Sequence, residues 1–384
     1  MLIVLIGSRD FNHFNDGISI YVKNLVLNKY INGKNFNFIL YVPEFRHVNG
    51  TSENLGNGKE ESKFKIIPVW SASIGSLEKF TYSFSVLFHL LGTLRLTGKY
   101  VFHIHGMSSN WIIPFLRLFY PQSKIIFTQH SLEHINKAIV FPKRIFARIT
   151  FLLGYLANKK IAVSCYVAKT MSNAKIIRNG GAFLNNTVLD KLYLNIQAIT
   201  GIDKSEYLLF VGRLNYEKGI DYAIVSFIRS KLFETKKFII VGDIANNKNG
   251  YKRLLKLFEQ NGITDWPQKF YFTGRQDQNC ILSLMRNAYL NVVPSFSEGF
   301  SLVTQECLNI GRYPLLSDIP AHKEFDLPNE FYFTHGSIDD LVSCFNCYSF
   351  SDSFMNGENS FRRTWDEVVI ENYKIYECFD KYNQ

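Results

Sequence analysis

Short apolar runs alternate with helix-length amphipathic segments along the first half of the chain. Helices are predicted between the strands, at residues 18–30, 80–95, 111–119 and 144–157. Short strands that are apolar on both faces and alternate with helices are typical of a parallel sheet covered on both sides. The apolar runs predict strands at residues 2–6, 38–42, 64–69, 101–104, 124–128, 161–164 and 175–177.

The second half repeats this plan, and it ends in a predicted helix at residues 360–382. Because 384 residues are too many for a single core, we expect two domains. The fold class is therefore α/β, with two Rossmann-like, doubly wound parallel-sheet domains that face a cleft. The second set of predicted strands lies at residues 207–211, 237–241, 269–273, 290–293, 313–317 and 330–333.

The expected domain limits follow from this repeat. An N-terminal domain is expected at residues 1–190, with a C-terminal helix at 361–384 that packs back on it. A C-terminal domain is expected at residues 204–360. The polar stretch 189–204 is expected to link the two domains, and the polar stretch 48–62 is expected to be an exposed loop.

Composition narrows the class of protein. No apolar run reaches about 18 residues, so no membrane-spanning helix is predicted. The start of the chain is interpreted as a strand and not as a signal peptide, because it lacks a positive region and a cleavage site. Six scattered cysteines in a long chain are typical of a reducing compartment, so a cytoplasmic location is expected.

Charge is unevenly divided along the chain. Residues 1–195 contain 23 Lys and Arg against 9 Asp and Glu, whereas the remainder contains 20 against 24. A basic half can meet an anionic surface or ligand, or it can be a solvated face in a lysine-rich protein. No nucleic-acid-binding module accompanies the charge, so nucleic acid is not an expected partner.

Two glutamates carry the most specific signal. Glu298 and Glu306 lie eight apart in a segment that leaves a predicted strand, turns, and begins a helix near Ser301. Glu298 is then in the loop at the helix N-terminus, and Glu306 is about a turn and a half inside the helix. Two carboxylates can grip hydroxyl groups of one extended ligand, while the free N–H groups at 300–303 face a phosphate. This layout suits a nucleotide-sugar.

Two cations follow a strand earlier in the same half. Gly212 allows a tight exit from the strand, and Arg213 and Lys218 follow five residues apart. A planar guanidinium, which donates two parallel hydrogen bonds, and a compact ammonium together suit a diphosphate. Taken alone, the pair can equally be two solvated cations near a turn. With the two glutamates about 80 residues further on, phosphate binding is favoured.

These motifs resemble glycosyltransferase family 4, the retaining sugar transferases of GT-B architecture. The resemblance rests on Gly212 to Gly219, on Pro294 to Glu306 and on Ser317 to Glu324. It implies that Arg213 and Lys218 hold the donor diphosphate, that Glu298 contacts the transferred sugar and that Glu306 binds ribose hydroxyls. It also implies that the backbone at Phe300, Ser301, Leu302 and Val303 approaches the donor, and that Arg275 lies near the base.

The N-terminal half resembles the family more loosely. Gly17 corresponds to the second of two glycines that the family often has near the donor, and Asp16 stands at the first position, where it is a plausible N-cap. His130 corresponds to the histidine beside the transferred sugar. His105 ends another predicted strand. For both histidines, packing or capping is the alternative to a site role, and we expect His105 and Asp16 on the acceptor side.

The resemblance implies a hexosyltransferase that moves a sugar from a UDP- or GDP-sugar to a glycan or lipid-linked hydroxyl, in O-antigen, capsule or lipopolysaccharide assembly. No Asp-x-Asp motif is present, so we expect no metal and no cofactor. Cations around the apolar run 145–156, Lys137 among them, indicate a basic amphipathic helix that can rest on an anionic inner membrane, or a helix whose apolar face is simply core. A nucleotide-sugar 2-epimerase and a non-catalytic subunit of a glycan-assembly complex remain as alternatives.

Overall fold

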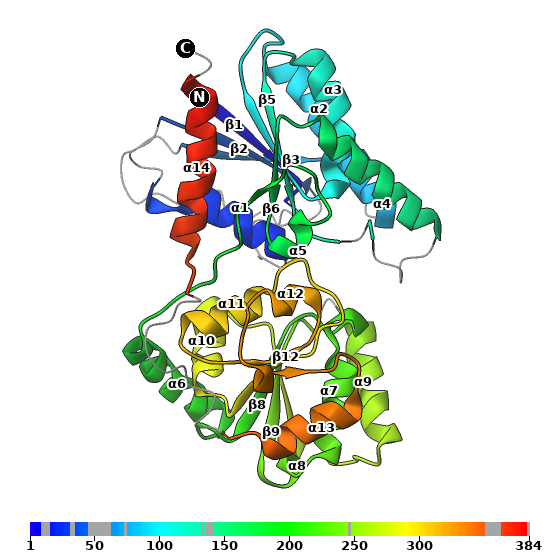
Figure 1. Ribbon diagram of the computed structural model, residues 1–384, viewed down its shortest axis with the longest axis vertical. Coiled ribbons are helices and arrows are strands. Elements are labelled where there is room, and N and C mark those ends of the chain that lie inside the picture. Colours follow the sequence, from blue (N-terminus) through cyan, green and yellow to red (C-terminus); the bar gives the residue numbers. More distant parts are fainter. Residues whose placement is uncertain are drawn as a thin grey trace. The chain divides into compact units, whose positions relative to one another are not determined.

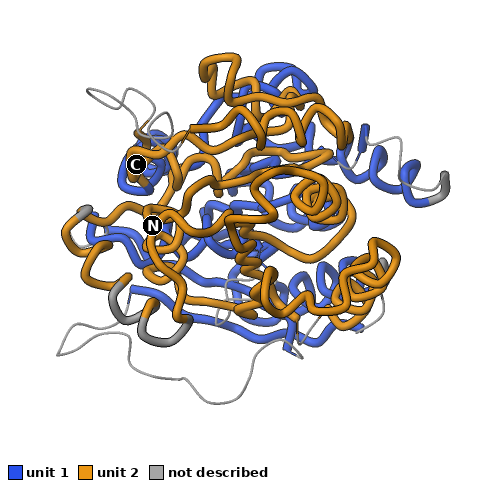
Figure 2. Tube along the Cα trace, turned by 90° about the horizontal axis from the view of Figure 1, so that it is seen from below, with its two compact units in different colours: residues 1–179, 365–384 blue, residues 180–364 orange. Residues whose placement is uncertain are grey.

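The computed structural model describes residues 1–8, 16–30, 35–44, 63–72, 75–132, 134–135, 141–244, 247–349 and 362–381. The chain divides into two compact units, which Figure 2 colours separately. Unit 1 consists of Met1–Asn179 and Trp365–Gln384, and unit 2 consists of Gly180–Thr364. The expected exposed loop at 48–62 lies outside the described residues.

Unit 1 is built on a seven-stranded parallel sheet in the order β3-β2-β1-β4-β5-β6-β7. The central strand Val101–His105 is buried along its whole length, and its two neighbours are buried except at their first residue, as expected of a sheet covered on both faces. The strands are β1 (Leu2–Ile6), β2 (Asn37–Pro43), β3 (Phe64–Val69), β4 (Val101–His105), β5 (Lys124–Gln129), β6 (Lys159–Ala162) and β7 (Lys175–Ile176).

Helices cover both faces of this sheet (Figure 1). On one side lie α1 (Gly17–Leu27) and the C-terminal helix α14 (Trp365–Lys381), which contact each other. On the other side lie α2 (Gly75–Thr93), the 3₁₀ turn η3 (Met107–Ile112), α3 (Ile113–Phe119) and α4 (Phe141–Leu153). The 3₁₀ turn η4 (Gly154–Leu156) follows α4, and the short α5 (Cys165–Ala168) follows β6.

Unit 2 repeats the plan with a six-stranded parallel sheet in the order β10-β9-β8-β11-β12-β13. Alternate residues of its strands enter two separate cores, because successive side chains of a strand point to opposite faces. The strands are β8 (Tyr207–Val211), β9 (Lys237–Val241), β10 (Phe270–Gly274), β11 (Leu290–Val293), β12 (Leu315–Ser317) and β13 (Tyr332–Phe333).

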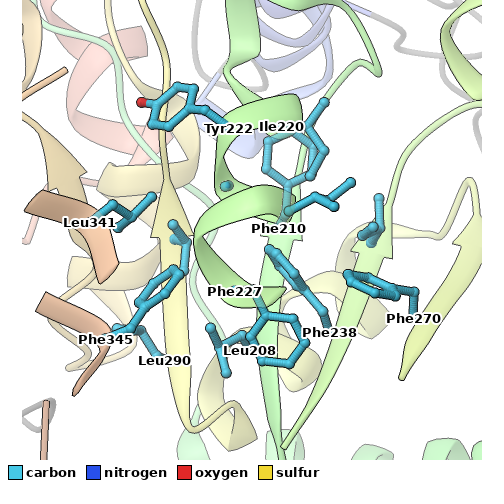
Figure 3. Close-up of a cluster of buried hydrophobic side chains, with 14 of the residues drawn as sticks. Leu208, Phe210, Ile220, Tyr222, Phe227, Phe238, Phe270, Leu290, Leu341 and Phe345 are labelled. Atoms are coloured by element: carbon cyan, nitrogen blue, oxygen red, sulfur yellow. The ribbon is translucent and has the colours of Figure 1, made fainter. Parts of the chain in front are cut away.

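Aromatic side chains dominate the core on one face of this sheet. Figure 3 shows Phe227 of α7 beside Phe238 of β9 and Phe270 of β10, and the ring centroids of Phe227 lie 5.4 and 5.6 Å from the other two. This face is covered by α7 (Ile220–Arg229), α8 (Leu232–Thr235), α9 (Lys248–Gln260) and α13 (Ile338–Cys347). The opposite face is covered by α6 (Asn186–Thr200), α10 (Gln278–Asn287) and α11 (Leu302–Asn309).

Two parallel sheets of this kind confirm the predicted fold class. One expectation was wrong: the polar stretch 189–204, expected to be a linker, largely forms helix α6, which packs on α10. The apolar side chains Leu189 and Tyr193 are almost fully buried in the second core of unit 2, so a few well-spaced apolar residues outweigh the polar composition of the segment. No helix among the described residues has the length and hydropathy needed to cross a bilayer.

Candidate functional site

The sheet order of unit 2 reverses between β8 and β11, so the loops after these two strands meet at one edge. Gly219 makes their close approach possible. Its φ is +70°, and a Cβ there would lie 1.8 Å from the carbonyl oxygen of Pro294. The Phe296 N–H also donates to the Glu217 carbonyl at 2.9 Å. These contacts fix the loop that carries Lys218 against the loop that carries Glu298.

Lys218 and Glu298 form an ion pair across this junction. The Lys218 ammonium donates to Glu298 Oε1, and the Ser295 hydroxyl donates to the same oxygen at 2.7 Å. The two side chains are only 22% and 11% exposed. Burial by itself would raise the pKa of Glu298, but Lys218 and the nearby His322 outweigh it, together with the two hydrogen bonds. The pKa of Glu298 is lowered, so the carboxylate is ionised at neutral pH.

His322, on the short helix α12 (Pro320–Lys323), extends this network. Its Nδ1 lies 2.9 Å from the Ser317 carbonyl, and the Ser317 hydroxyl donates to the Ser295 carbonyl at 2.6 Å. Burial lowers the pKa of His322 to about 4, although Glu298 opposes the shift. The imidazole is therefore neutral. Since a carbonyl can only accept, Nδ1 carries the proton, and Nε2 is an acceptor with no hydrogen-bond partner among the described residues.

Two arginines named from the sequence stand apart from the ion pair. Arg213 follows β8 directly, is exposed, and makes no hydrogen bond or ion pair with any described residue. Lys218 packs back towards the same strand end: its Cγ lies 3.9 Å from the position of a Cβ at Gly212. Arg275 is exposed in the loop after β10. Both guanidinium groups are available to a ligand.

Helix α11 begins where the sequence indicated. Ser301 is its N-cap: the hydroxyl accepts from the Thr304 N–H at 3.3 Å and from the Thr304 hydroxyl at 2.7 Å. Leu302 and Val303 occupy the first turn, where backbone N–H groups have no partner inside the helix. Phe300 packs on Phe325, with ring centroids 5.4 Å apart, which anchors the loop before the helix.

Glu306 lies in the second turn of α11 in a different environment from Glu298. It is 5% exposed, and burial raises the pKa of Glu306 to about 7. The side chain of Gln278 and the backbone N–H of Ala182 offset this shift only in part. Contacts among the described residues do not join Glu306 to the Lys218–Glu298 pair. A ligand that donates two hydroxyl hydrogen bonds to the Glu306 carboxyl would favour its ionised form.

The corresponding edge of the unit 1 sheet carries neutral imidazoles. His105 ends β4 and His130 follows β5, and His105 Nδ1 lies 3.2 Å from His130 Nε2. Burial lowers the pKa of His130 to about 3 and that of His105 well below its ordinary value. The Tyr21 ring lies 5.1 Å from the His130 ring, edge to face. His105 Nε2 is buried with no hydrogen-bond partner among the described residues.

Helix α14 supports these histidines from behind. The Tyr376 hydroxyl lies 2.6 Å from His103 Nδ1, and the His103 ring lies 4.1 Å from the His105 ring. On the same helix, the Asn372 side-chain amide donates to the Tyr21 hydroxyl at 2.7 Å. The last helix of the chain thus holds the side chains that surround His105 and His130.

The start of α1 behaves as the sequence predicts. Asp16 is the N-cap, and its Oδ1 accepts from the Ser19 N–H at 2.8 Å. Gly17 is the first residue of the helix. Nearby, Gly7 has a φ of +109°, and a Cβ there would lie 2.1 Å from the His105 carbonyl oxygen. Only glycine lets β1 and β4 end this close together.

The structure therefore joins some of the predicted residues and not others. Lys218 and Glu298 are in contact, as are His105 and His130. Arg213, Arg275 and Glu306 belong to the same unit but do not contact the ion pair among the described residues. The sequence reasoning missed His322 and Tyr376. His322 lies inside a motif already used for the resemblance, so the signal was present, whereas nothing local indicated Tyr376.

The described residues contain no group of three or more His, Cys, Asp or Glu side chains placed to hold a metal ion. The six cysteines are free thiols. Positive charge next to Glu298 comes from Lys218, and the N-cap of α11 follows Glu298 after two residues.

Comparison with known proteins agrees with this geometry. Residues 194–345 match the family described as glycosyl transferases group 1. An uncharacterized 41.2 kDa protein from the cps region of Klebsiella pneumoniae is 25% identical over 169 residues, which cover 41% of this chain and 47% of that protein. The matches to two curated relatives span 31% and 47% of the lengths of those relatives, less than half of each.

Solved structures resemble the whole chain. Sucrose-phosphate synthase from Thermosynechococcus elongatus has a TM-score of 0.78 at 15% identity, with 99% of each chain covered. HepE of Anabaena, in complex with UDP and glucose, has a TM-score of 0.73 at 14% identity, covering 98% of this chain and 100% of HepE. At these identities the likeness shows the fold. The likeness covers both units and shows the GT-B fold of two Rossmann-like domains, whereas the match to glycosyl transferases group 1 covers residues 194–345 alone.

Proposed function

We propose that the protein is a retaining glycosyltransferase that uses a UDP- or GDP-sugar as donor and a hydroxyl of a glycan or lipid-linked molecule as acceptor. The observation that carries the proposal is the buried Lys218–Glu298 pair at the switch point of unit 2, with the unpaired Arg213 in the same loop. Two cations beside a helix N-terminus suit a pyrophosphate. An ionised carboxylate next to them suits the hydroxyl groups of the attached sugar.

Each residue of unit 2 has a separate task in this proposal. Lys218 and Arg213 hold the two phosphates, and the N–H groups at 300–303 assist them. Glu298 accepts hydrogen bonds from the transferred sugar. Glu306 accepts them from the ribose, and Arg275 contacts the base. We add His322, whose neutral Nε2 is suited to accept a hydrogen bond from a further sugar hydroxyl.

The proposed chemistry needs no separate base. The acceptor oxygen bonds to the anomeric carbon on the face from which the phosphate leaves, and the bond from that carbon to the phosphate oxygen breaks. The departing phosphate takes the acceptor's proton. Lys218 and Arg213 stabilise the negative charge that develops on the leaving group, so no metal is assigned to the reaction. Chelation is expected to leave the transfer rate unchanged.

In unit 1 we assign His130 to the transferred sugar and His105 and Asp16 to the acceptor. Both imidazoles are neutral at pH 7, because burial lowers the pKa of each. A neutral imidazole can exchange hydrogen bonds with hydroxyl groups without bringing a charge next to the reacting carbon.

The acceptor and the biological setting rest on the relatives. The protein from a cps region and the UDP and glucose bound to HepE support a hexose from a UDP-sugar and a role in bacterial surface polysaccharide assembly, as O-antigen, capsule or lipopolysaccharide. We propose a cytoplasmic protein that meets its acceptor at the inner face of the membrane.

The test is calorimetric titration with UDP-, GDP- and ADP-sugars, followed by product analysis with the sugar that binds. Transfer with the anomeric configuration kept is the expected result. The donor is also incubated alone, because a 2-epimerase would convert it without an acceptor. An inverted product, an epimerised donor, or no binding to any sugar of the panel would each contradict the proposal.

A further inference from the structure

Helix α4 and the turn η4 expose a stripe of aliphatic side chains. Ile145, Ile149, Leu152 and Leu156 are 43%, 45%, 63% and 46% exposed. Their spacing of four, three and four residues places them along one side of the helix. Single exposed aliphatic residues are ordinary on protein surfaces, but four in a continuous row indicate a contact surface.

The apolar character of α4 is not explained by the core. The helix already packs its other side inward, where Ala147, Thr150 and Phe151 are buried. It contacts η3 on that side, and Phe146 packs on Trp111 with ring centroids 5.1 Å apart. The expectation that the apolar face of this helix is simply domain core therefore accounts for one side only.

Cations lie beside the exposed stripe, and the segment that carries the stripe contains no Asp or Glu. Lys143, Arg148 and Lys159 are exposed, and Arg144 and Lys160 are partly exposed. The sequence from residue 134 to 189 has nine Lys and Arg and no Asp or Glu. The wider segment 79–189 has 14 Lys and Arg and one acid, Glu133. Lys137 lies outside the described residues.

We propose that this surface docks the protein on an anionic phospholipid bilayer, with α4 lying in the plane of the headgroups. The surface, named the α4 face, consists of the four aliphatic residues above, of Arg148 and Arg144, which lie one helical turn apart beside the stripe, and of Lys159, which follows it in the chain. The aliphatic side chains enter the boundary between headgroups and acyl chains, and the cations meet lipid phosphates. With 13 residues, α4 is about 20 Å long, which suits lying at an interface and is too short for a span.

The charges and the aliphatic stripe of the α4 face argue against two other partners. In a symmetric pair of two copies, each α4 face would bring its cations against those of the other without an acid to neutralise them. Nucleic acid would match the cations but would leave the aliphatic stripe without a partner, since its recognition uses polar and aromatic contacts. A bilayer with anionic headgroups satisfies both parts of the surface.

The test is co-sedimentation of the full chain with vesicles of phosphatidylglycerol and phosphatidylethanolamine, compared with vesicles of phosphatidylcholine. We expect binding to the anionic vesicles at low salt and much weaker binding at high salt. Replacing Arg148 and Lys159 by Gln is expected to weaken binding about fivefold for each cation removed. Replacing Ile149 and Leu152 by Gln is expected to weaken it at least about tenfold, and the residual binding should remain salt-dependent because the cations are unchanged.

Matched controls come from unit 2. Val188 on α6 is 45% exposed, the same as Ile149, and Lys252 and Lys256 are exposed on α9. The changes Val188→Gln and Lys252→Gln with Lys256→Gln should leave vesicle binding unchanged. All of the changed residues are on the surface, and the circular dichroism spectrum reports whether each variant is folded, independently of the membrane and of the donor.

Three outcomes would overturn the inference. One is no binding of the wild-type chain to anionic vesicles at low salt. Another is binding that the control changes weaken as much as the α4-face changes do. The third is concentration-dependent dimerisation that the Ile149 and Leu152 changes abolish, because it would show that a second copy occupies the face. A failure of the donor assignment would leave vesicle binding unaffected, so the two proposals fail separately.

Discussion

At the C-terminal ends of its central strands, unit 2 carries a charged pair, Lys218 and Glu298, whereas unit 1 carries the neutral histidines His105 and His130. Both sites lie at the C-terminal ends of parallel strands: in unit 2 they follow β8 and β11, between which the strand order reverses, and in unit 1 they follow the neighbouring strands β4 and β5. The difference comes from what lies behind each loop. In unit 2, opposite charges and hydroxyl groups meet and keep a carboxylate ionised. In unit 1, aromatic rings remove imidazoles from water and keep them uncharged.

This contrast shows that the same fold can carry either charged or neutral site residues at its strand ends, depending on the side chains that pack against them. Charged site residues suit an anionic donor, and neutral ones suit hydroxyl groups. The contrast also predicts that changes in the two units will affect different measurements, and each prediction below uses one unit as the reference for the other.

The largest effect is expected for Lys218→Ala. The change removes a cation from the proposed diphosphate site and leaves Glu298 without its ion-pair partner. We expect the transfer rate to fall about a hundred- to a thousandfold, equivalent to about 3–4 kcal/mol of barrier. Glu298→Ala is expected to be comparably inactive. Steady-state kinetics measures the loss, with the exposed Lys252→Ala as the control.

A variant Lys218→Ala that keeps full activity would remove Lys218 from the mechanism. The circular dichroism spectrum distinguishes inactivity from unfolding, since neither residue belongs to a core cluster.

A change of about 3 kcal/mol is expected in the stability of Glu306→Gln. The pKa of this buried acid is raised from 4.5 to about 7. Between these pH values the folded state binds more protons than the unfolded state, so the free energy of unfolding falls as the pH rises through that window. Gln removes this cost. The variant should therefore be more stable than wild type above about pH 7 and equally stable near pH 4.5, while donor affinity falls.

Denaturant unfolding at several pH values measures this effect, and Glu330→Gln, at an exposed acid, is the control. If Glu306→Gln were destabilising above pH 7, the account of this carboxyl would be wrong.

Acid is expected to weaken unit 1 more than unit 2. Burial lowers the pKa of fully buried His103 from 6.5 to about 3, so below pH 6.5 the unfolded state binds more protons and stability falls as the pH drops. At pH 5 the loss from His103 is about 2 kcal/mol. The neighbouring groups that couple to it are His105 and His130, whose pKa values are also lowered, and no raised acid offsets them.

In unit 2, the lowered pKa of His322 also makes the free energy of unfolding fall as the pH drops. The raised pKa of Glu306 has the opposite effect between about pH 7 and pH 4.5, so the two contributions offset each other. Hydrogen exchange measured near pH 7 and pH 5, corrected for intrinsic rates, compares the units. Equal weakening of both, or greater weakening of unit 2, would remove the contrast.

The smallest effect is expected for Tyr376→Phe, which leaves buried His103 Nδ1 without its partner. We expect a loss of about 1–2 kcal/mol of stability. Tyr373→Phe on the same helix is the matched control, because Tyr373 donates to the Leu25 carbonyl at 2.7 Å and does not contact a histidine. Both variants should lose similar stability, but only Tyr376→Phe should change the pH profile of transfer. Identical profiles for the two would limit Tyr376 to a structural role.

Much of the fold followed from local pattern. Strands such as β1, β8, β9 and β11 have the predicted bounds because their residues are apolar on both faces, which leaves no alternative periodicity. Helix α6 was missed because its burial depends on α10, far along the chain. The Lys218–Glu298 contact was indicated by motif spacing. His322 was overlooked although it lies inside the motif from Ser317 to Glu324 and bonds to Ser317 within it. The role of Tyr376 could not be predicted, because its partner His103 lies 273 residues away in the chain.

The central claim is that unit 2 binds a nucleoside-diphosphate sugar through Lys218 and Glu298, while the acceptor residues of unit 1 do not contribute to donor affinity. Calorimetric titration of UDP-, GDP- and ADP-sugars into wild type, Lys218→Ala and His105→Asn tests it most directly. The account predicts that the donor which binds wild type loses at least about tenfold in affinity for Lys218→Ala and keeps nearly full affinity for His105→Asn. Unchanged affinity in Lys218→Ala would contradict it.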